Sequence, residues 1–410
     1  MNRRLALIAG AFLSLACASC SQQSSLPSTQ ATPAPAVVSP PGPAVTEGDV
    51  HRFAKDLEKA VAAQDSARAN ELFRFPELFE RSISDLGASA DFFKGVKQGI
   101  QAASAQNTFG TQIVAQVAKG GSYRLLRVHV VDGRHRALFR LIQPSKGGVN
   151  YHDLLVARFP DGRIGMEDAH IYVTDELLSQ SMRRLFIPLI AESNRGALSR
   201  LAGADREYLD NLPLLKQFTG AIRAGRHAEA LTIYRKLPTK LQQDRTIMIM
   251  YVQAASGADQ SEYAAAMEAM RTSFPKDTCT EFLSIDYYVL RKEFDESIRS
   301  IDRLDKRLGG DPYLNVMRAG TMILAERYAE AGAAAEKAVA AEPNLAPAYW
   351  SRITVTLKQK KFQDTFRWLR LVVEKCGEDV ADLTSVPEYA EFVKSPSYKD
   401  WLKWQKSRQK

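Results

Sequence analysis

The spacing of apolar side chains changes along this chain of 410 residues. Apolar residues recur every three or four positions over residues 50–63, 67–83 and 89–103, which predicts three helices. The period then falls to two, and turn-forming Gly, Asp and Pro residues separate the alternating runs. Five strands are therefore expected, over residues 111–117, 122–131, 135–142, 149–159 and 164–173. Helices followed by hairpins indicate an α+β domain, at residues 47–195, with a curved antiparallel sheet packed on helices.

The dipeptide Asp132-Gly133 is typical of a two-residue hairpin turn. If Val131 lies opposite Arg134, the flanking strands have one apolar face and one basic face. We expect the apolar face to join the core and the basic face to meet solvent, with contact to anionic headgroups or an acidic partner as the other interpretation. The apolar face carries Leu126, Val128, Val130, Ala137, Phe139 and Leu141, and the basic face carries Arg127, His129, Arg134, Arg136 and Arg140.

The last hairpin carries the candidate chemistry. If Phe159 lies opposite Ile164, the register places Asp153 opposite His170 and Asp168 opposite Leu155. Tyr151 and Tyr172 then share the same face. A carboxylate beside an imidazole fixes its tautomer and raises its basicity, so Asp153, Asp168 and His170 are candidates for a general acid–base site. A purely structural cross-strand pair is the alternative.

Beyond an amphipathic segment at residues 175–201, the second half of the chain contains an internal repeat. An aromatic residue or His recurs at intervals of 31 to 36 residues, each time three residues before a small residue. These positions are His227, Tyr263, Phe294, Tyr328 and Phe362. Repeats of this length indicate stacked helix pairs. We expect five pairs, over residues 212–238, 243–276, 277–311, 312–344 and 345–376, within an all-α domain at 196–378 that residues 379–410 cap.

The clearest unit, residues 312–343, is similar to the tetratricopeptide repeat family. Small, large and aromatic residues and a proline occupy the family's positions at Ala319, Met322, Tyr328, Ala331, Ala338 and Pro343. The resemblance implies an all-α solenoid that binds a protein or peptide in a concave groove lined by the first helix of each repeat. The candidate groove residues are Lys216, Thr219, Tyr251, Tyr287, Asn315, Arg318, Tyr349 and Arg352.

The α+β domain resembles the NTF2-like superfamily in the order of its elements. This resemblance implies that the concave face of the sheet can hold a small ligand or carry out acid–base chemistry with an Asp/His pair. Asp153, Asp168 and His170 are the residues that would serve such a site.

Residues 1–20 have the features of a secretory signal. Arg3 and Arg4 precede twelve residues of an apolar core, which is too short to span a membrane. The end of this segment resembles a bacterial lipobox, which implies lipidation of Cys20, with Cys17 as the alternative. Ordinary cleavage, for example after Ala18, would instead give a soluble periplasmic or secreted protein. Residues 21–46, rich in Pro, Ser and Ala, are expected to form a disordered tether.

Composition excludes several classes of function. A chain with 45% hydrophobic and 25% charged residues is not wholly disordered, and a net charge of +8 spread along it does not indicate nucleic acid binding. Walker, dinucleotide-binding, HExxH and GxSxG motifs do not occur, so neither a cofactor nor a metal is expected. The sequence therefore predicts a bacterial, envelope-anchored, non-catalytic scaffold that binds a partner protein. A small-ligand binder or acid–base enzyme using the sheet face is the alternative.

Overall fold

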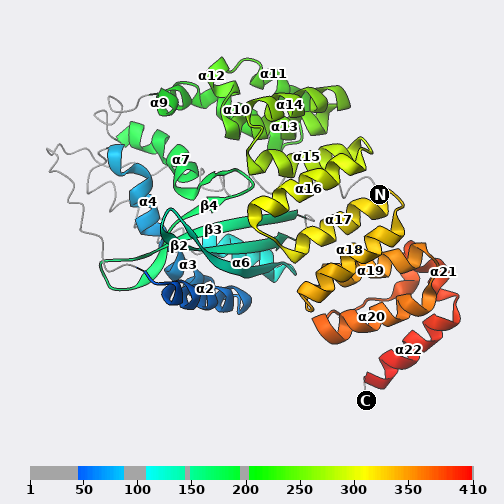
Figure 1. Cartoon of the computed structure of the whole chain (residues 1–410). Coiled ribbons are helices and arrows are strands. Elements are labelled where there is room, and N and C mark those ends of the chain that lie inside the picture. The colour runs from blue at the N-terminus through cyan, green and yellow to red at the C-terminus, as the bar shows by residue number, and fades with distance from the viewer. Residues whose placement is uncertain (1–44, 87–107, 144–147, 194–202, 409–410) are drawn as a thin grey trace. The chain divides into compact units, whose positions relative to one another are not determined.

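The structure is a computed structural model that describes residues 45–86, 108–143, 148–193 and 203–408 (Figure 1). The signal-type segment with Cys17 and Cys20, nearly all of the predicted tether and the predicted helix at residues 89–103 lie outside the described residues. No helix within the described ranges is both long and apolar enough to cross a membrane. The chain divides into two compact units, Met1–Thr280 and Glu281–Lys410. The division falls inside a helix and does not coincide with the expected domain end at residue 195.

The two helices expected over residues 50–63 and 67–83 form three helices in the structure. Helix α2 (Glu47–Ala62) begins at a capping box formed by Thr46 and Asp49. The helix expected over residues 67–83 is interrupted at Arg74, which has a left-handed φ of 47°. Pro76 explains the break, because a proline fits the first turn of a helix and not its interior. The segment thus forms α3 (Ser66–Phe73) and α4 (Phe75–Ile83), followed by a 3-10 turn, η2 (Ser84–Leu86).

The strand expected at residues 111–117 is wrong, because these residues belong to helix α6 (Phe109–Ala118). The Thr108 hydroxyl caps this helix by accepting from the Thr111 amide and also contacts Asn70 of α3. The buried residues Phe109, Ile113 and Val114 follow helical spacing. The alternating apolar residues suggested a strand, but the N-cap at Thr108 and the packing against α3 favour a helix.

The four long strands are found where the sequence places them. They form an antiparallel meander in chain order, and a short fifth strand adds to its end. The strands are β1 (Ser122–Val131), β2 (Arg134–Gln143), β3 (Gly148–Arg158), β4 (Ile164–Ile171) and β5 (Glu176–Leu177). Val131 pairs with Arg134 as predicted, and a bulge at Leu126 shifts the register farther along β1. Helices followed by an antiparallel sheet are therefore confirmed, while the NTF2-like resemblance stays a prediction.

The basic face of the sheet is not the solvent surface that the alternation predicts. Arg134 is exposed, but Arg140 on the same face is only 1% exposed, and every residue of β2 from Ala137 to Gln143 is buried. Conversely, Val130 on the expected core face is 59% exposed. Alternation identifies a solvent face only when one side of a sheet is uncovered, and β2 is covered on both sides.

Each of the five predicted repeat segments contains a helix pair (Figure 1). Helices α7 (Leu178–Ser193), α9 (Gly203–Asp210) and the one-turn α12 (Thr239–Gln242) accompany the pairs. The pairs in the first unit are α10 (Leu212–Arg223) with α11 (His227–Tyr234), and α13 (Arg245–Ala258) with α14 (Gln260–Ser273). Helix α15 (Thr278–Leu290) pairs with α16 (Phe294–Leu308), α17 (Pro312–Leu324) with α18 (Tyr328–Ala341), and α19 (Ala346–Lys358) with α20 (Phe362–Cys376).

The turn inside each of the last three pairs has the same backbone conformation. Lys292, Glu326 and Lys360 have φ values between 55° and 60° and recur at intervals of 34 residues. Each lies two residues before the aromatic residue that begins the second helix of its pair. The predicted aromatic position therefore marks a helix start, except at Tyr263. In that pair, Asp259 alone joins α13 to α14 and caps the second helix.

The C-terminal segment covers the last pair, as expected of a cap. It contains two 3-10 turns, η3 (Leu383–Ser385) and η4 (Pro387–Tyr389), and helices α21 (Ala390–Val393) and α22 (Pro396–Arg408). Phe392, Tyr398 and Trp401 pack in one cluster with residues of α19 and α20. This packing removes the apolar end of the array from water.

Asp175 joins the sheet to helices α13 and α15. Its carboxylate accepts from the backbone amide of Thr278 at 2.9 Å, at the start of α15, and lies 3.0 Å from Nε2 of His170 on β4. Its backbone carbonyl accepts from Arg245 of α13 at 2.7 Å. Asp175 has a φ of 54°, which a residue other than Gly adopts only when its surroundings hold it there. Within the first unit, Asp175 therefore links the sheet to α13 and to the start of α15.

Candidate functional site

The last hairpin brings the predicted residues together, but its register near the turn differs from the predicted one. Arg158, rather than Phe159, pairs with Ile164, and a bulge between Leu155 and Val156 then restores the expected pairing. Asp153 lies opposite His170, and Asp168 lies opposite Leu155, as predicted. The shared face also holds the rings of Tyr151 and Tyr172, 6.2 Å apart.

Each of the three acid–base candidates has a side-chain partner outside the predicted set, and their role in acid–base chemistry stays a prediction. Asp153 lies 2.8 Å from Nε2 of His129 and 3.4 Å from Arg136. Asp168 accepts from the backbone amide and the hydroxyl of Ser179 and so caps helix α7. His170 contacts Asp175 instead of Asp153.

Tyr172 carries no charge on this face at neutral pH. Burial is the largest cause that raises its pKa, to about 12, and the Asp153 carboxylate contributes to the same shift. The phenol therefore stays neutral. Together these contacts describe a structural polar network.

Two of the predicted groove residues are clamps between neighbouring helix pairs. Arg318 on α17 forms ion pairs with Asp302 and Asp305 of α16, both at 2.8 Å. Thirty-four residues later, Arg352 on α19 pairs with Glu336 of α18 at 3.0 Å. Their partners Asp302 and Glu336 are also 34 residues apart, so an equivalent ion pair forms twice in the array. These two arginines contact the preceding pair, and their assignment to a groove stays a prediction.

The other predicted groove residues differ in how accessible they are. Tyr349 is 3% exposed and donates its hydroxyl to the Pro343 carbonyl, so it belongs to the core. Asn315 accepts from Arg318 and supports that clamp. Three side chains are half-buried: Tyr251 stacks on Tyr234, Tyr287 lies beside Arg291, and Thr219 donates to a carbonyl of its own helix. Lys216 is exposed.

A different face of the same helices presents apolar side chains. On α17, Val316, Gly320 and Ile323 are half-buried, and Leu324 is 44% exposed. On α19, the half-buried Trp350, Thr354 and Leu357 follow the first three at an interval of 34 residues. We call these seven residues the apolar stripe. Helices α17 and α19 contact each other, so the two halves of the stripe are neighbours.

Gly320 lies in the middle of the stripe and carries no side chain. A Cβ atom built on this glycine would meet no heavy atom within 4 Å. The packing around α17 therefore does not require a glycine at this position, and a larger side chain here would project from the stripe. The spacing of the stripe could have been found from the sequence, since both halves repeat an apolar, small, apolar pattern at the same helical interval.

The fold defines the class of the C-terminal half as a helical-repeat array, in agreement with the tetratricopeptide resemblance. Two solved structures with partial similarity are titled "MamA MSR-1 C2" and "MamA AMB-1 P212121". They are 11% and 12% identical, the matches cover 40% and 44% of this chain and 96% and 98% of theirs, and both TM-scores are 0.33. Such low TM-scores do not establish a shared fold. The evidence for a helical-repeat array is the set of helix pairs described above. No protein-family model and no curated protein matches the chain.

Proposed function

We propose that this chain is a non-catalytic scaffold of the bacterial cell envelope that binds a partner protein on the apolar stripe. The repetition of half-buried apolar side chains on two neighbouring first helices, with Leu324 exposed beside them, carries this proposal. The partner segment has apolar side chains at helical spacing, because the stripe presents apolar groups about one helical turn apart on each side of a small residue.

The energy of binding would come from apolar burial. Removing apolar surface from water stabilises a complex by about 25 cal/mol per Å², and a few buried anchors supply most of the affinity. Trp350 and Leu324 are the largest apolar contacts that the stripe offers. A partner side chain packed over Gly320 would be the complementary anchor.

Gly320→Arg tests the proposal, because it places a long charged side chain in the middle of the apolar stripe. Gly220→Arg is a matched control, since Gly220 lies inside α10 and also has no heavy atom within 4 Å of an added Cβ. We expect crosslinking pull-down from envelopes to recover a partner with the wild-type chain and the control, and to lose it with Gly320→Arg. Recovery of the same partner at wild-type yield by a folded Gly320→Arg chain would contradict the proposal.

The membrane anchor is the second part of the proposal, and its support is the signal-type sequence at residues 1–20. We expect palmitate to label the chain and globomycin to block its processing. Cys20→Ser should abolish labelling, whereas labelling that persists in this variant would assign the lipid to Cys17. A wild-type chain that takes up no label would instead favour a soluble periplasmic or secreted protein.

The small-ligand or acid–base alternative has two imidazole–carboxylate contacts in its favour, His129 with Asp153 and His170 with Asp175. Asp168 instead accepts from the Ser179 hydroxyl at the start of α7.

A further inference from the structure

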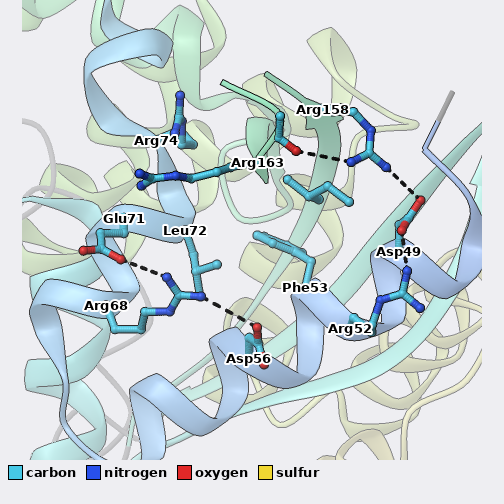
Figure 2. A pocket seen from close by; sticks show the side chains of 12 residues that line it. Asp49, Arg52, Phe53, Asp56, Arg68, Glu71, Leu72, Arg74, Arg158 and Arg163 are labelled. Carbon is cyan, nitrogen blue, oxygen red and sulfur yellow. Dashed lines mark hydrogen bonds and ion pairs between the residues drawn. The ribbon is translucent and has the colours of Figure 1, made fainter. Parts of the chain in front are cut away.

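A cavity of about 420 Å³ lies in the first unit, on elements separate from the apolar stripe. Helices α2 and α3 form two of its sides, and the turn between β3 and β4 forms a third (Figure 2). Phe53 and Leu72, both buried, and Ile164 form an apolar part of the lining. Charged side chains make up most of the remainder.

Five of the twelve lining residues are arginines, and three are acidic. The arginines come from four parts of the fold, namely α2, α3, the link after α3 and the β3–β4 hairpin. They are Arg52, Arg68, Arg74, Arg158 and Arg163. Guanidinium groups repel one another, so bringing them together requires anions. The carboxylates of the protein pair with these arginines to different extents.

The carboxylate of Asp49, in the first turn of α2, forms ion pairs with two arginines. Asp49 accepts from Arg52 at 2.5 Å and from Arg158 at 3.3 Å (Figure 2). The backbone amide and hydroxyl of Thr46 hold the pKa of Asp49 below its usual value, so the carboxylate stays ionised. Arg158 also donates to the Gly162 carbonyl at 3.2 Å, so both of its terminal nitrogen atoms have a partner. By contrast, Arg68 has two carboxylates, Glu71 at 2.8 Å and Asp56 at 3.7 Å.

Arg163 is the least compensated arginine of the five. Its side chain is 72% exposed, and its Nε lies 3.9 Å from Asp161, which already pairs with Arg74 at 2.7 Å. Arg74 is held further by Glu77 and by the ring of Phe159. Figure 2 shows Arg163 extending toward Arg74 on one side of the cavity.

Two buried donors near the cavity also lack acceptors. Nε of Arg74 and Nε of Arg158 make no hydrogen bond to the described part of the chain, but both atoms are covered, so a ligand could reach only the terminal nitrogen atoms of these arginines. A planar guanidinium matches the oxygen atoms of phosphate, to which it can donate two parallel hydrogen bonds. The apolar lining at Phe53 and Leu72 suits a carbon skeleton attached to such a group.

We propose that this cavity binds a phosphate ester, with Arg163 as the group that contacts the phosphate. The ester could belong to a free metabolite or to a phospholipid headgroup, since both present the same chemistry. Asp49 and Asp161 are positioning residues, because they hold the guanidinium groups at the cavity. The site does not depend on partner binding at the apolar stripe.

Calorimetry with the purified full chain tests the proposal with glycerol 3-phosphate as the free ester and glycerol as its phosphate-free control. Flotation with phosphatidylglycerol vesicles, compared with phosphatidylcholine vesicles, tests the headgroup source. We expect saturable binding of at least one phosphate probe that weakens about tenfold in Arg163→Gln, as expected for the loss of a charge-assisted bond. The matched control Arg206→Gln removes a similarly exposed arginine outside the cavity and should bind as the wild type does.

Each outcome either supports or overturns the site. Binding of glycerol 3-phosphate that Arg163→Gln weakens assigns a free ester, and vesicle binding with the same dependence assigns a headgroup. The proposal is overturned if neither probe binds, if glycerol binds equally well, or if Arg163→Gln and Arg206→Gln behave alike. Because Arg163 lies on an exposed turn, an unchanged thermal transition should show that Arg163→Gln remains folded.

Discussion

His152 is a buried imidazole whose environment keeps it neutral. It packs beside the rings of Phe109 and Tyr123, and its nitrogen atoms contact the Tyr123 hydroxyl and the Asn150 amide. Burial lowers its pKa from 6.5 to about 3. The folded state therefore binds no proton at His152 over a pH range in which the unfolded state does.

The pKa of His152 predicts a loss of stability in acid. As the pH falls below 6.5, protonation of the unfolded state should reduce the free energy of unfolding by up to about 1.4 kcal/mol per pH unit, until the pH nears 3. Urea unfolding at pH 7, 6 and 5 measures this slope. His152→Gln should make the slope shallower, and the half-exposed His51→Gln should leave it unchanged. Equal slopes in the wild type and His152→Gln would contradict this account.

Two glycines inside neighbouring helices should respond differently to alanine. At Gly320 an added Cβ meets open space, so Gly320→Ala should stabilise the chain by about 0.5–1 kcal/mol, the usual helix preference. At Gly332 of α18 the Cβ would overlap Nη1 of Arg352, which must then leave its ion pair with Glu336. We expect Gly332→Ala to gain less, and to regain the full benefit in an Arg352→Ala background. Thermal unfolding measures both, and equal gains in the wild-type background would refute the contact.

At the scale of elements, the connection through Asp175 should be sensitive to substitution. Asp175→Ala removes the cap of α15 and places an alanine at a positive φ, so we expect a loss of about 2 kcal/mol in the free energy of unfolding. Asp175→Asn should cost less, because asparagine tolerates the backbone conformation and keeps an acceptor. Asp259→Ala also removes a helix cap, that of α14, but Asp259 has an extended backbone that alanine can adopt. We expect this variant to lose about 1 kcal/mol in the free energy of unfolding. Equal losses in Asp175→Ala and Asp175→Asn would argue against a strained cap.

Helix pairs and hairpins could be predicted from the sequence because their signals are local. Aromatic and small residues at a fixed interval located the five pairs, and Asp132-Gly133 fixed the register of its hairpin. The strand expected at residues 111–117 failed because periodicity over seven residues does not outweigh a capping threonine. Pro76 could have predicted the break at Arg74, but the helical spacing of the apolar residues on both sides was given more weight than this proline.

Site residues were harder to predict because they depend on which face of an element is covered. Arg318 and Arg352 lie on first helices, as groove residues would, but their face packs on the preceding pair. The register correctly placed Asp153 opposite His170, yet their side chains bond to His129 and Asp175. The arginine-lined cavity could not be predicted, since its residues come from segments more than 80 positions apart.

At the scale of the whole molecule, each unit carries a separate candidate for binding. The first unit holds the arginine-lined cavity, and the second holds the apolar stripe. Their chemistries differ, since one suits a phosphate ester and the other an apolar protein segment. Substitutions in the cavity should therefore leave partner capture intact, and Gly320→Arg should leave phosphate binding intact. Loss of both activities in a single folded variant would contradict this separation.

Site-specific photocrosslinking tests the central claim most directly. A photoreactive residue in place of Leu324 reports on the stripe, and one in place of the exposed Lys337 on α18 reports on a surface outside it. The account predicts a crosslinked partner protein in cells from position 324, absent from position 337 and lost when Gly320→Arg is added. Crosslinks of equal yield at both positions, or at position 337 alone, would contradict it.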